Sequence, residues 1–357
     1  MNKRIALGIV LILIIGTIFY FESKNKVNSI NGNNYIINVS HNEEIKGIID
    51  EKSLKYKKAV ELVNPDGYIN TDNITIADLI GKKIILVDFW TYSCINCQRT
   101  IPYINNWYET YKDKGLVIIG VHTPEFEFEK DYSNVNKAVS KFNITYPVIL
   151  DNNALTWGAY NNHYWPRKYL IDIDGFIVYD HIGEGGYEET EKVIQDLIKE
   201  RNERLNIKSI DIAIKKPQNT VDVNFNMIET PEIYLGVNTN RGNFNGISLD
   251  EEDYNLPKEL KQDYVYLEGR WLGNPESSEL KINSGKIVIN FGAKKANIVA
   301  GSKNGAKLMI YVDGNYIKDV YVKDFGLYEL VSMDEYSRHN LEVIAESGLQ
   351  AYTFTFG

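Results

Sequence analysis

The sequence predicts an α/β domain followed by an all-β sandwich, with an apolar segment at the amino terminus. Nearly continuous apolar runs at residues 83–90 and 116–121 alternate with helical patterns up to residue 201, which is typical of a sheet covered by helices. Beyond residue 202, short β-rich runs are separated by turn signals, as in sandwiches. Residues 5–21 form an uncharged apolar run after a basic start, which indicates a membrane anchor.

The amino-terminal segment predicts the compartment. No small-x-small cleavage site follows the apolar run, so we expect an uncleaved signal anchor within residues 1–30. A cleaved signal peptide remains the alternative. The polar stretch at residues 31–59 is interpreted as a tether. The protein is therefore expected to be a single-pass protein of the cell membrane whose catalytic domain is extracytoplasmic.

The α/β domain is expected at residues 60–204, as a mixed sheet with helices on both faces. Strands are predicted for the two apolar runs and for residues 147–150, and a hairpin is predicted at residues 168–181 around Asp174-Gly175. Helices are predicted by apolar periodicity at residues 75–80, 93–112, 134–142, 155–160 and 188–201.

The second domain is expected at residues 230–357, after a linker at residues 205–229. Its β-rich runs lie at residues 281–289, 307–312, 316–322, 341–345 and 352–356. Turn pairs such as Asn304-Gly305 and Asp313-Gly314 separate them, which favours a jelly-roll-like β-sandwich.

The chain has two cysteines, Cys94 and Cys97, and their spacing requires a chemical explanation. A disulfide between them closes almost no loop and stabilises little. A zinc site needs further ligands, and the five histidines share no metal-ligand spacing, so no metal is expected. At the start of a helix, by contrast, Cys94 can act as an attacking thiolate and Cys97 as the resolving thiol. We therefore expect a redox-active disulfide Cys94–Cys97 and no separate cofactor.

The net charge of -9 is spread along the chain without a basic block. A nucleic-acid-binding protein needs a clustered basic face, so a nucleic-acid partner is excluded.

Several separated motifs resemble one family. The segment ILVDFWTYSCINC is similar to the strand and motif of thioredoxins, and GVHTPEFEFE, YWPRKYLIDIDG and GEGGYEETE resemble the DipZ family within the TlpA-like group. The resemblance covers residues 60–357 and implies a thioredoxin-like thiol–disulfide oxidoreductase that reduces protein disulfides, for example in cytochrome c biogenesis. DipZ proteins carry an amino-terminal multi-span electron-carrying domain, and here a single anchor is expected instead. The electron donor would then be a separate CcdA-like membrane protein.

The resemblance also implies roles for individual residues. Asp88, in the buried strand before the motif, would take the proton of Cys97 during resolution. Thioredoxins often place a lysine beside this acid on the next strand, but residues 116–121 contain none, which leaves the proton route open. Pro166 matches the cis-proline that faces the disulfide. The client groove is expected to include Trp90, Tyr92, Glu125 and Trp165.

Two other functions remain open. Thr91 lies three residues before Cys94, as in peroxiredoxins, which makes a thiol peroxidase the alternative enzyme, although the proline expected before it is missing. The second domain resembles a carbohydrate-binding module, so the chain is alternatively a cell-wall or partner-binding protein with an auxiliary redox domain. Trp271 and tyrosines such as Tyr234 are its candidate rings for a carbohydrate ligand, and packing within the sandwich is the alternative role for them.

Overall fold

The computed structural model describes residues 43–208, 213–214, 216–218 and 220–357, and the chain divides into two compact units between residues 58 and 59. In the first unit, residues 43–55 are helical and strand β1 spans Lys57–Lys58, so the segment interpreted as a tether contains a helix. The expected anchor lies outside the described residues. Within the described part of the chain, no helix has the length and apolar character needed to cross a membrane.

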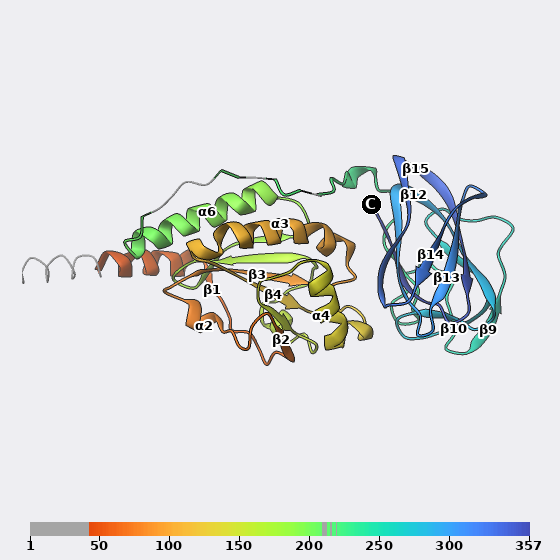
Figure 1. Cartoon of the computed structure of the whole chain (residues 1–357), viewed down its shortest axis with the longest axis horizontal. Coiled ribbons are helices and arrows are strands. Elements are labelled where there is room, and N and C mark those ends of the chain that lie inside the picture. Colours follow the sequence, from red (N-terminus) through yellow and green to blue (C-terminus); the bar gives the residue numbers. More distant parts are fainter. Residues whose placement is uncertain (1–42, 209–212, 215, 219) are drawn as a thin grey trace, which may run out of the picture. The chain divides into compact units, whose positions relative to one another are not determined.

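A mixed sheet forms the centre of the α/β part, residues 59–205 (Figure 1). Its strands run in the order β7-β6-β3-β4-β5-β2. Strands β3, β4 and β5 are parallel to one another, whereas β6, β7 and β2 pair antiparallel with their neighbours. Their bounds are β2 Gly67–Ile69, β3 Ile84–Trp90, β4 Leu116–His122, β5 Val148–Leu150, β6 Arg167–Ile171 and β7 Phe176–Ile182. The predicted mixed sheet is confirmed.

Helices cover both faces of this sheet because side chains alternate along β3. Leu86 and Trp90 pack with residues of α3, α4 and α6 on one face, whereas Ile85 and Phe89 pack with residues of α2 on the other. The helical elements are α2 Ile76–Leu79, α3 Ile95–Tyr111, η1 Lys112–Lys114, η2 Glu127–Lys130, α4 Tyr132–Lys141, α5 Leu155–Ala159 and α6 Tyr187–Arg204. By this alternation Asp88 lies on the same face as α3.

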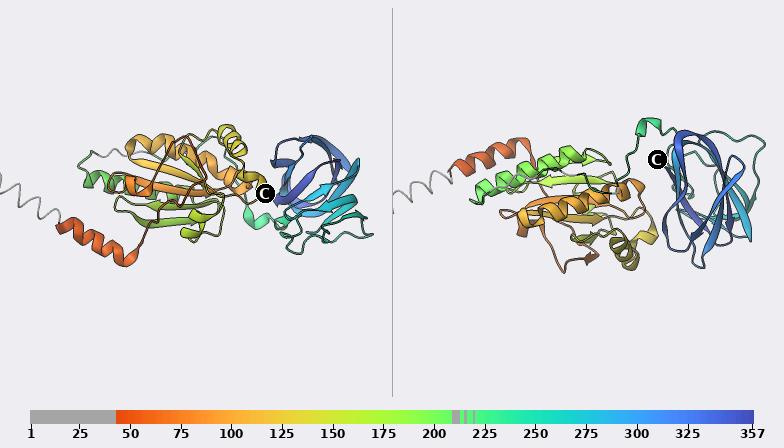
Figure 2. Two further views of the ribbon diagram at one scale, coloured as in Figure 1. Left: turned by 90° about the horizontal axis from the view of Figure 1, so that it is seen from below. Right: turned by 45° about the horizontal axis from the view of Figure 1, so that its top comes forward.

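The β part, residues 230–357, is all-β as predicted, and a short turn η3 (Phe225–Met227) precedes it. Its strands are β8 Ile233–Tyr234, β9 Glu251–Tyr254, β10 Val265–Gly273, β11 Ser278–Leu280, β12 Ser284–Gly301, β13 Ala306–Val312, β14 Asn315–Val322, β15 Gly326–Glu346 and β16 Gln350–Phe356. The views in Figure 2 show them curving around a common core, in which Trp271 and Phe291 are fully buried.

The long strands β12 and β15 join this part together. Strand β12 pairs with β15 along nearly its whole length, with β10 at its beginning and with β16 at its end. The strands of the β part are linked by hydrogen bonds in the order β14-β13-β15-β12-β10-β11-β16-β8, and β9 pairs with β10 outside this path. Register shifts near Ala293 and Ala296 allow β12 to bend between its partners. The sequence analysis predicted only segments of these strands.

Candidate active site

The two cysteines lie at the junction between β3 and α3. Cys94 is the N-cap of α3, and its sulfur accepts a hydrogen bond from the Cys97 N–H at 3.4 Å. Both thiols are free; Cys94 is half-buried, whereas Cys97 is buried. A helix N-terminus favours negative charge on the capping group. The more accessible sulfur, that of Cys94, is therefore the one placed to react as a thiolate.

The surroundings of Cys97 favour the protonated form of its thiol. Burial raises the pKa of the Cys97 thiol well above its ordinary value, and the hydrogen bond and charge of Cys94 raise it further. A protonated thiol is a poor nucleophile, so Cys97 needs a base before it can attack. The structure thus separates the two thiols by burial, and an acid–base group close to Cys97 is required.

Asp88 is placed to be that group. It is buried in the middle of β3, and burial raises the pKa of its carboxyl to about 7, against the opposing charge of Lys168. A carboxyl with such a pKa can accept and release a proton near neutral pH. The charge of Asp88 also contributes to the raised pKa of Cys97, which places the two groups within electrostatic reach of each other.

Lys168 is a residue that the sequence analysis missed. The lysine sought on residues 116–121 comes instead from β6, on the other side of β3, where Lys168 pairs directly with Asp88. Directly paired residues of antiparallel strands project to the same face. Lys168 is fully buried, its Nζ donates to the Gly183 carbonyl at 3.0 Å, and burial lowers its pKa. A lysine within a predicted buried strand was the available signal, because buried lysines need a partner.

Buried polar atoms without hydrogen-bond partners lie near Asp88. Among the described residues, Asp88 Oδ1, Trp90 Nε1 and the Tyr146 hydroxyl are buried without a hydrogen-bond partner. Gly120 pairs with Asp88 on β4, and a Cβ there would lie 3.0 Å from Trp90 Nε1 and 3.1 Å from Tyr146 Cε2. Burial, and then the charges of Asp88 and Cys97, raise the pKa of Tyr146. Unpartnered buried polar groups are costly, and their concentration beside Asp88 and Cys97 favours a functional role.

The expected groove residues divide into two groups. Trp165 lines a cavity together with Cys94, and its Nε1 donates to the Thr123 carbonyl at 3.0 Å. The peptide bond between Trp165 and Pro166 is cis, as the resemblance implied. Trp90 and Tyr92, by contrast, are buried rather than available to a client. The Trp90 ring lies edge-on to His122, and the Tyr92 hydroxyl donates to the Phe325 carbonyl of the β part at 3.2 Å.

The cavity beside Cys94 has a volume of about 680 Å³ and is lined by both parts of the second unit. The α/β part contributes Cys94, Ile95, Asn96, Glu125 and residues 163–165. The segment before the β part and the β part itself contribute Phe225, Ile228, Glu229, Thr230, Pro231, Glu232, Tyr234, Arg241, Thr355 and Phe356. The sequence patterns predict a redox site on the α/β domain alone, and no local pattern indicates this shared wall.

Glu125 is the expected site residue with the closest contact across the two parts. Its Oε1 lies 2.5 Å from the Tyr234 hydroxyl oxygen, and the same oxygen lies 2.9 Å from Glu232 Oε2, so both carboxyl groups are within hydrogen-bond distance of this hydroxyl. Burial raises the pKa of Glu125 to about 8, and the charges of Glu232 and Glu129 add to the shift.

Glu129, which the sequence analysis also missed, holds the local backbone. It is fully buried; Oε1 accepts from the Ser93 N–H and hydroxyl, and Oε2 accepts from the N–H groups of Glu125 and Phe126. The residue before Cys94 and the loop after β4 are thus tied to one carboxyl group. The alternation GVHTPEFEFE gave no signal to distinguish this glutamate from its neighbours.

The residues behind the two alternative functions occupy other positions. Thr91 is fully buried, and His122, also fully buried, lies with its Nε2 3.5 Å from the Thr91 hydroxyl. Burial lowers the pKa of His122 to about 3, so it is neutral at physiological pH. Trp271 is fully buried, and its Nε1 donates to the Glu268 carbonyl, which suits packing rather than a carbohydrate platform.

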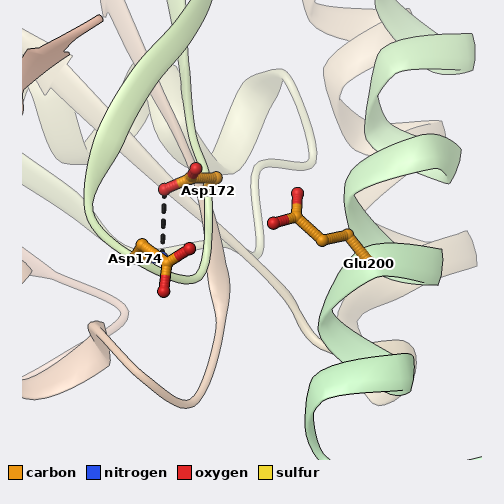
Figure 3. A group of neighbouring side chains, drawn as sticks. All are labelled: Asp172, Asp174 and Glu200. Carbon is orange, nitrogen blue, oxygen red and sulfur yellow. Dashed lines mark hydrogen bonds between the residues drawn. The ribbon is translucent and has the colours of Figure 1, made fainter. Parts of the chain in front are cut away.

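A group of carboxylates at the β6–β7 turn offers metal-ligand chemistry. Asp172, Asp174 and Glu200 each place one oxygen within 4.8 Å of the others, and Figure 3 shows the hydrogen bond from the Asp174 N–H to Asp172. Asp172 also accepts from the Phe176 N–H, and Asp174 forms an ion pair with Arg204 at 2.6 Å. These contacts give the Asp172 carboxylate partners in the hairpin turn and the Asp174 carboxylate a partner on α6. The group is far from the cysteines in the sequence.

Two family models match the chain. The model named Redoxin matches residues 55–198, and the model described as a thioredoxin-like C-terminal domain matches residues 230–357. These ranges correspond to the α/β part and the β part.

Known proteins resemble the chain over the same regions. The protein DipZ of Mycobacterium tuberculosis is 36% identical over 305 residues, which cover 84% of this chain and 43% of DipZ; the chain therefore matches less than half the length of this relative. The thiol–disulfide oxidoreductase ResA of Bacillus cereus is 34% identical over 134 residues, which cover 35% of this chain and 75% of ResA. A solution structure of a thioredoxin-like protein in the oxidized form is 26% identical and covers 41% of this chain and 98% of its own, with a TM-score of 0.38.

Proposed function

Because the chain belongs to the thioredoxin-like thiol–disulfide oxidoreductases, we propose that it reduces protein disulfides with Cys94 as the nucleophile and Cys97 as the resolving thiol. The Cys94 thiolate attacks one client sulfur, which forms a mixed disulfide and releases the other client sulfur as a thiolate. Cys97 then gives its proton to Asp88 and attacks the Cys94 sulfur. The client leaves with two thiols, and the two electrons come from the cysteine pair, which becomes a disulfide.

The observation that carries this proposal is the unequal burial of the two sulfurs. Cys94 caps α3 in the wall of the cavity, whereas Cys97 is buried on the face of the sheet that carries Asp88. A client can therefore reach the first sulfur but not the second. The buried Thr91 leaves the peroxidase alternative without its expected hydroxyl in the cavity.

Insulin reduction in the presence of dithiothreitol tests the assignment. Cys94→Ser should abolish the activity, because no thiolate remains to attack. Cys97→Ser should retain the first step and accumulate mixed disulfides, detectable by mass spectrometry, because the resolving step is lost. The two variants serve as matched controls for each other. Activity of Cys94→Ser equal to that of the unchanged protein would show that the nucleophile lies elsewhere.

We further propose that the protein works as a reductase on the outer side of the cell membrane. The apolar run at residues 5–21 would anchor it, and a CcdA-like membrane protein would supply electrons, as in the resemblance to DipZ. Thiol trapping in cells should then find Cys94 and Cys97 mostly reduced when the carrier is present and oxidised when it is deleted. A pair that stays reduced without the carrier would contradict this donor or this compartment.

A further inference from the structure

One hydroxyl group of the β part lies between two carboxyl groups in the wall of the redox cavity. Tyr234 belongs to β8, Glu232 precedes that strand, and Glu125 lies in the loop after β4 of the α/β part. The Tyr234 oxygen is 2.5 Å from Glu125 Oε1 and 2.9 Å from Glu232 Oε2. All three side chains line the same cavity as Cys94.

The single hydrogen of the Tyr234 hydroxyl cannot serve both of its contacts with carboxyl groups, so a second proton is required. A tyrosine hydroxyl carries one hydrogen and can donate to one carboxylate, and an ionised carboxylate only accepts. The second short contact is a hydrogen bond only if one of the two carboxyl groups is protonated and donates to the tyrosine oxygen. The geometry thus describes two carboxyl groups that share one proton across a tyrosine.

The surroundings of the group favour keeping that proton near neutral pH. Burial raises the pKa of Glu125 to about 8, with contributions from the charges of Glu232 and Glu129, and burial also raises the pKa of Glu232. The hydrogen bond of Tyr234 lowers the pKa of Glu125, and so does the charge of Arg241, whose guanidinium carbon lies 4.3 Å from the centre of the Tyr234 ring; burial outweighs both effects. The other titratable side chains in the cavity wall, besides Cys94, are His163, Tyr164 and Glu229, and Glu229 is ion-paired with Arg338.

We propose that Glu125, protonated and hydrogen-bonded to Tyr234 beside Glu232, protonates the client thiolate released when Cys94 attacks the client disulfide. This inference rests on the proposed function and assigns the β part a role in the same reaction. The electron pair of the Cys94 thiolate forms the new S–S bond, and the client S–S bond breaks. The leaving sulfur takes that electron pair and the Glu125 proton. Glu125 remains as a carboxylate that accepts the Tyr234 hydrogen bond.

A proton donor at this position is useful because of the leaving group. An alkyl thiol such as cysteine has a pKa of about 8.5, so its thiolate is a basic leaving group, and exchange is slower the more basic that group is. General acids are most effective when their pKa lies near the operating pH. The Glu125 carboxyl, with its pKa of about 8, meets this condition.

The test compares two uncharged small disulfides that differ in leaving group. Bis(2-hydroxyethyl) disulfide releases a basic alkyl thiolate, so protonation of its sulfur should speed the reaction. The leaving group of 4,4′-dithiodipyridine is stabilised as a thione and does not need a proton on its sulfur. Single-turnover rates are measured for the fully reduced protein by stopped flow. Glu125→Gln should lower the ratio of the alkyl rate to the aromatic rate on the order of 10²-fold, the usual contribution of a general acid. The ratio cancels changes in folding or in Cys94 reactivity.

Glu127→Gln is the matched control. Glu127 lies two residues further along the chain, at the start of η2; its side chain is 73% exposed and pairs with Lys130 at 2.5 Å, so its substitution should leave the ratio unchanged. Tyr234→Phe keeps the ring but removes the hydroxyl, and it should lower the same ratio. The alkyl rate of the unchanged protein should also decline above about pH 8, as Glu125 loses its proton, and this decline should be absent in Glu125→Gln.

The outcomes separate this inference from the proposed function. If Glu125→Gln leaves the ratio of the two rates as it is in the unchanged protein, Glu125 is not the proton donor and the inference is overturned. If the unchanged reduced protein reacts with neither disulfide, the proposed function itself fails. A lowered ratio in Glu127→Gln as well would also overturn the inference, because the effect would then belong to the loop rather than to the shared proton.

Discussion

At the residue scale, the most informative group is Asp88 with its partner Lys168. An acid in the middle of a buried strand is costly when ionised, and here the pKa of Asp88 rises to about 7. The paired Lys168 limits this shift, because its charge favours the carboxylate. In the proposed mechanism, the pair thus provides a proton acceptor near Cys97 at neutral pH, where an unpaired buried carboxyl would hold its proton more tightly.

This pKa predicts a specific pH dependence of stability. The ordinary pKa of an aspartate carboxyl is 3.8, and burial raises the pKa of Asp88 to about 7, so between these pH values the folded protein binds a proton that the unfolded chain has released. Asp88 therefore lowers the free energy of unfolding least below pH 4. As pH rises toward 7, it lowers this free energy further, by up to about 1.4 kcal/mol per pH unit. Asp88→Asn should remove this slope in urea titrations at each pH.

The measured quantity is the difference in unfolding free energy between Asp88→Asn and the unchanged protein. It should shift in favour of the variant by several kcal/mol, about 4 kcal/mol at most, between pH 4 and pH 7. The exposed Asp113 provides the control, and Asp113→Asn should show little pH dependence. A constant difference for Asp88→Asn would mean that the folded carboxyl titrates as it does in the unfolded chain.

Several site residues could be predicted from the sequence and others could not. Cys94, Cys97 and Asp88 lie within one continuous motif, whose strand and helix patterns determine their relative positions. Lys168 meets Asp88 only through the register of β6 against β3, which no local pattern encodes. Tyr234 reaches Glu125 from 109 residues away, and only the packing of the two parts brings them together.

At the scale of elements, the loop after β4 is coupled to the turn before α3. Glu129 in η2 receives two hydrogen bonds from Ser93, the residue before Cys94, and two from the backbone of the loop itself. The carboxyl ends of β3 and β4 lie side by side because the strands are parallel, so one side chain can reach both. The same carboxyl therefore positions Cys94 and Glu125.

Glu129→Gln should be strongly destabilising. A carboxylate accepts hydrogen bonds at both oxygens. In glutamine, one of the two positions is an NH2 group, which cannot accept, so either the Ser93 donors or the N–H groups of Glu125 and Phe126 would lose their acceptor. We expect the unfolding free energy to fall by about 3 kcal/mol, the cost of leaving buried donors unpaired. Ser93→Ala removes a single side-chain bond and should cost only about 1 kcal/mol. Equal losses in urea denaturation of the two variants would contradict a central role for the carboxyl group.

The elements themselves were predicted well where the chain has strong local periodicity. Strands β3 and β4 and helices α3 and α6 lie close to the predicted ranges, because apolar patterns decide their burial. The long strands β12 and β15 were predicted only in part. Glycines and charged residues along β12, such as Gly292 and Lys294, break the apolar pattern, while the strand pairs with β15 at Gly292 and again from Lys295, after a register shift at Lys294.

At the scale of the whole second unit, an aromatic cluster joins the α/β part to the β part. Phe126 is buried with Tyr234, Val299 and Tyr352, and its ring centre lies 5.1 Å from that of Tyr352. The Tyr92–Phe325 and Glu127–Glu276 hydrogen bonds surround this cluster. Because the cavity beside Cys94 is lined from both sides, the cluster also fixes the geometry of the cavity.

This cluster should make the two parts unfold together. We expect differential scanning calorimetry of the purified protein to show one transition for the α/β and β parts, because neither can lose its structure without exposing the shared aromatic surface. Phe126→Ala removes a buried ring from the contact, at a cost of about 3–5 kcal/mol. Most of this lost free energy comes from the contact between the α/β part and the β part. The single unfolding transition should therefore split into two.

Phe176→Ala separates loss of coupling from simple loss of stability. Phe176 is as buried as Phe126 but lies at the start of β7, within the α/β part. Its removal should lower the transition temperature, by about 2–4 °C for each kcal/mol in a unit of this size, and the scan should change its shape far less than in Phe126→Ala. Two transitions in the unchanged protein would contradict the coupling. Calorimetry thus tests whether the cavity wall formed by Tyr234 and Glu232 stays in place as long as the α/β part is folded.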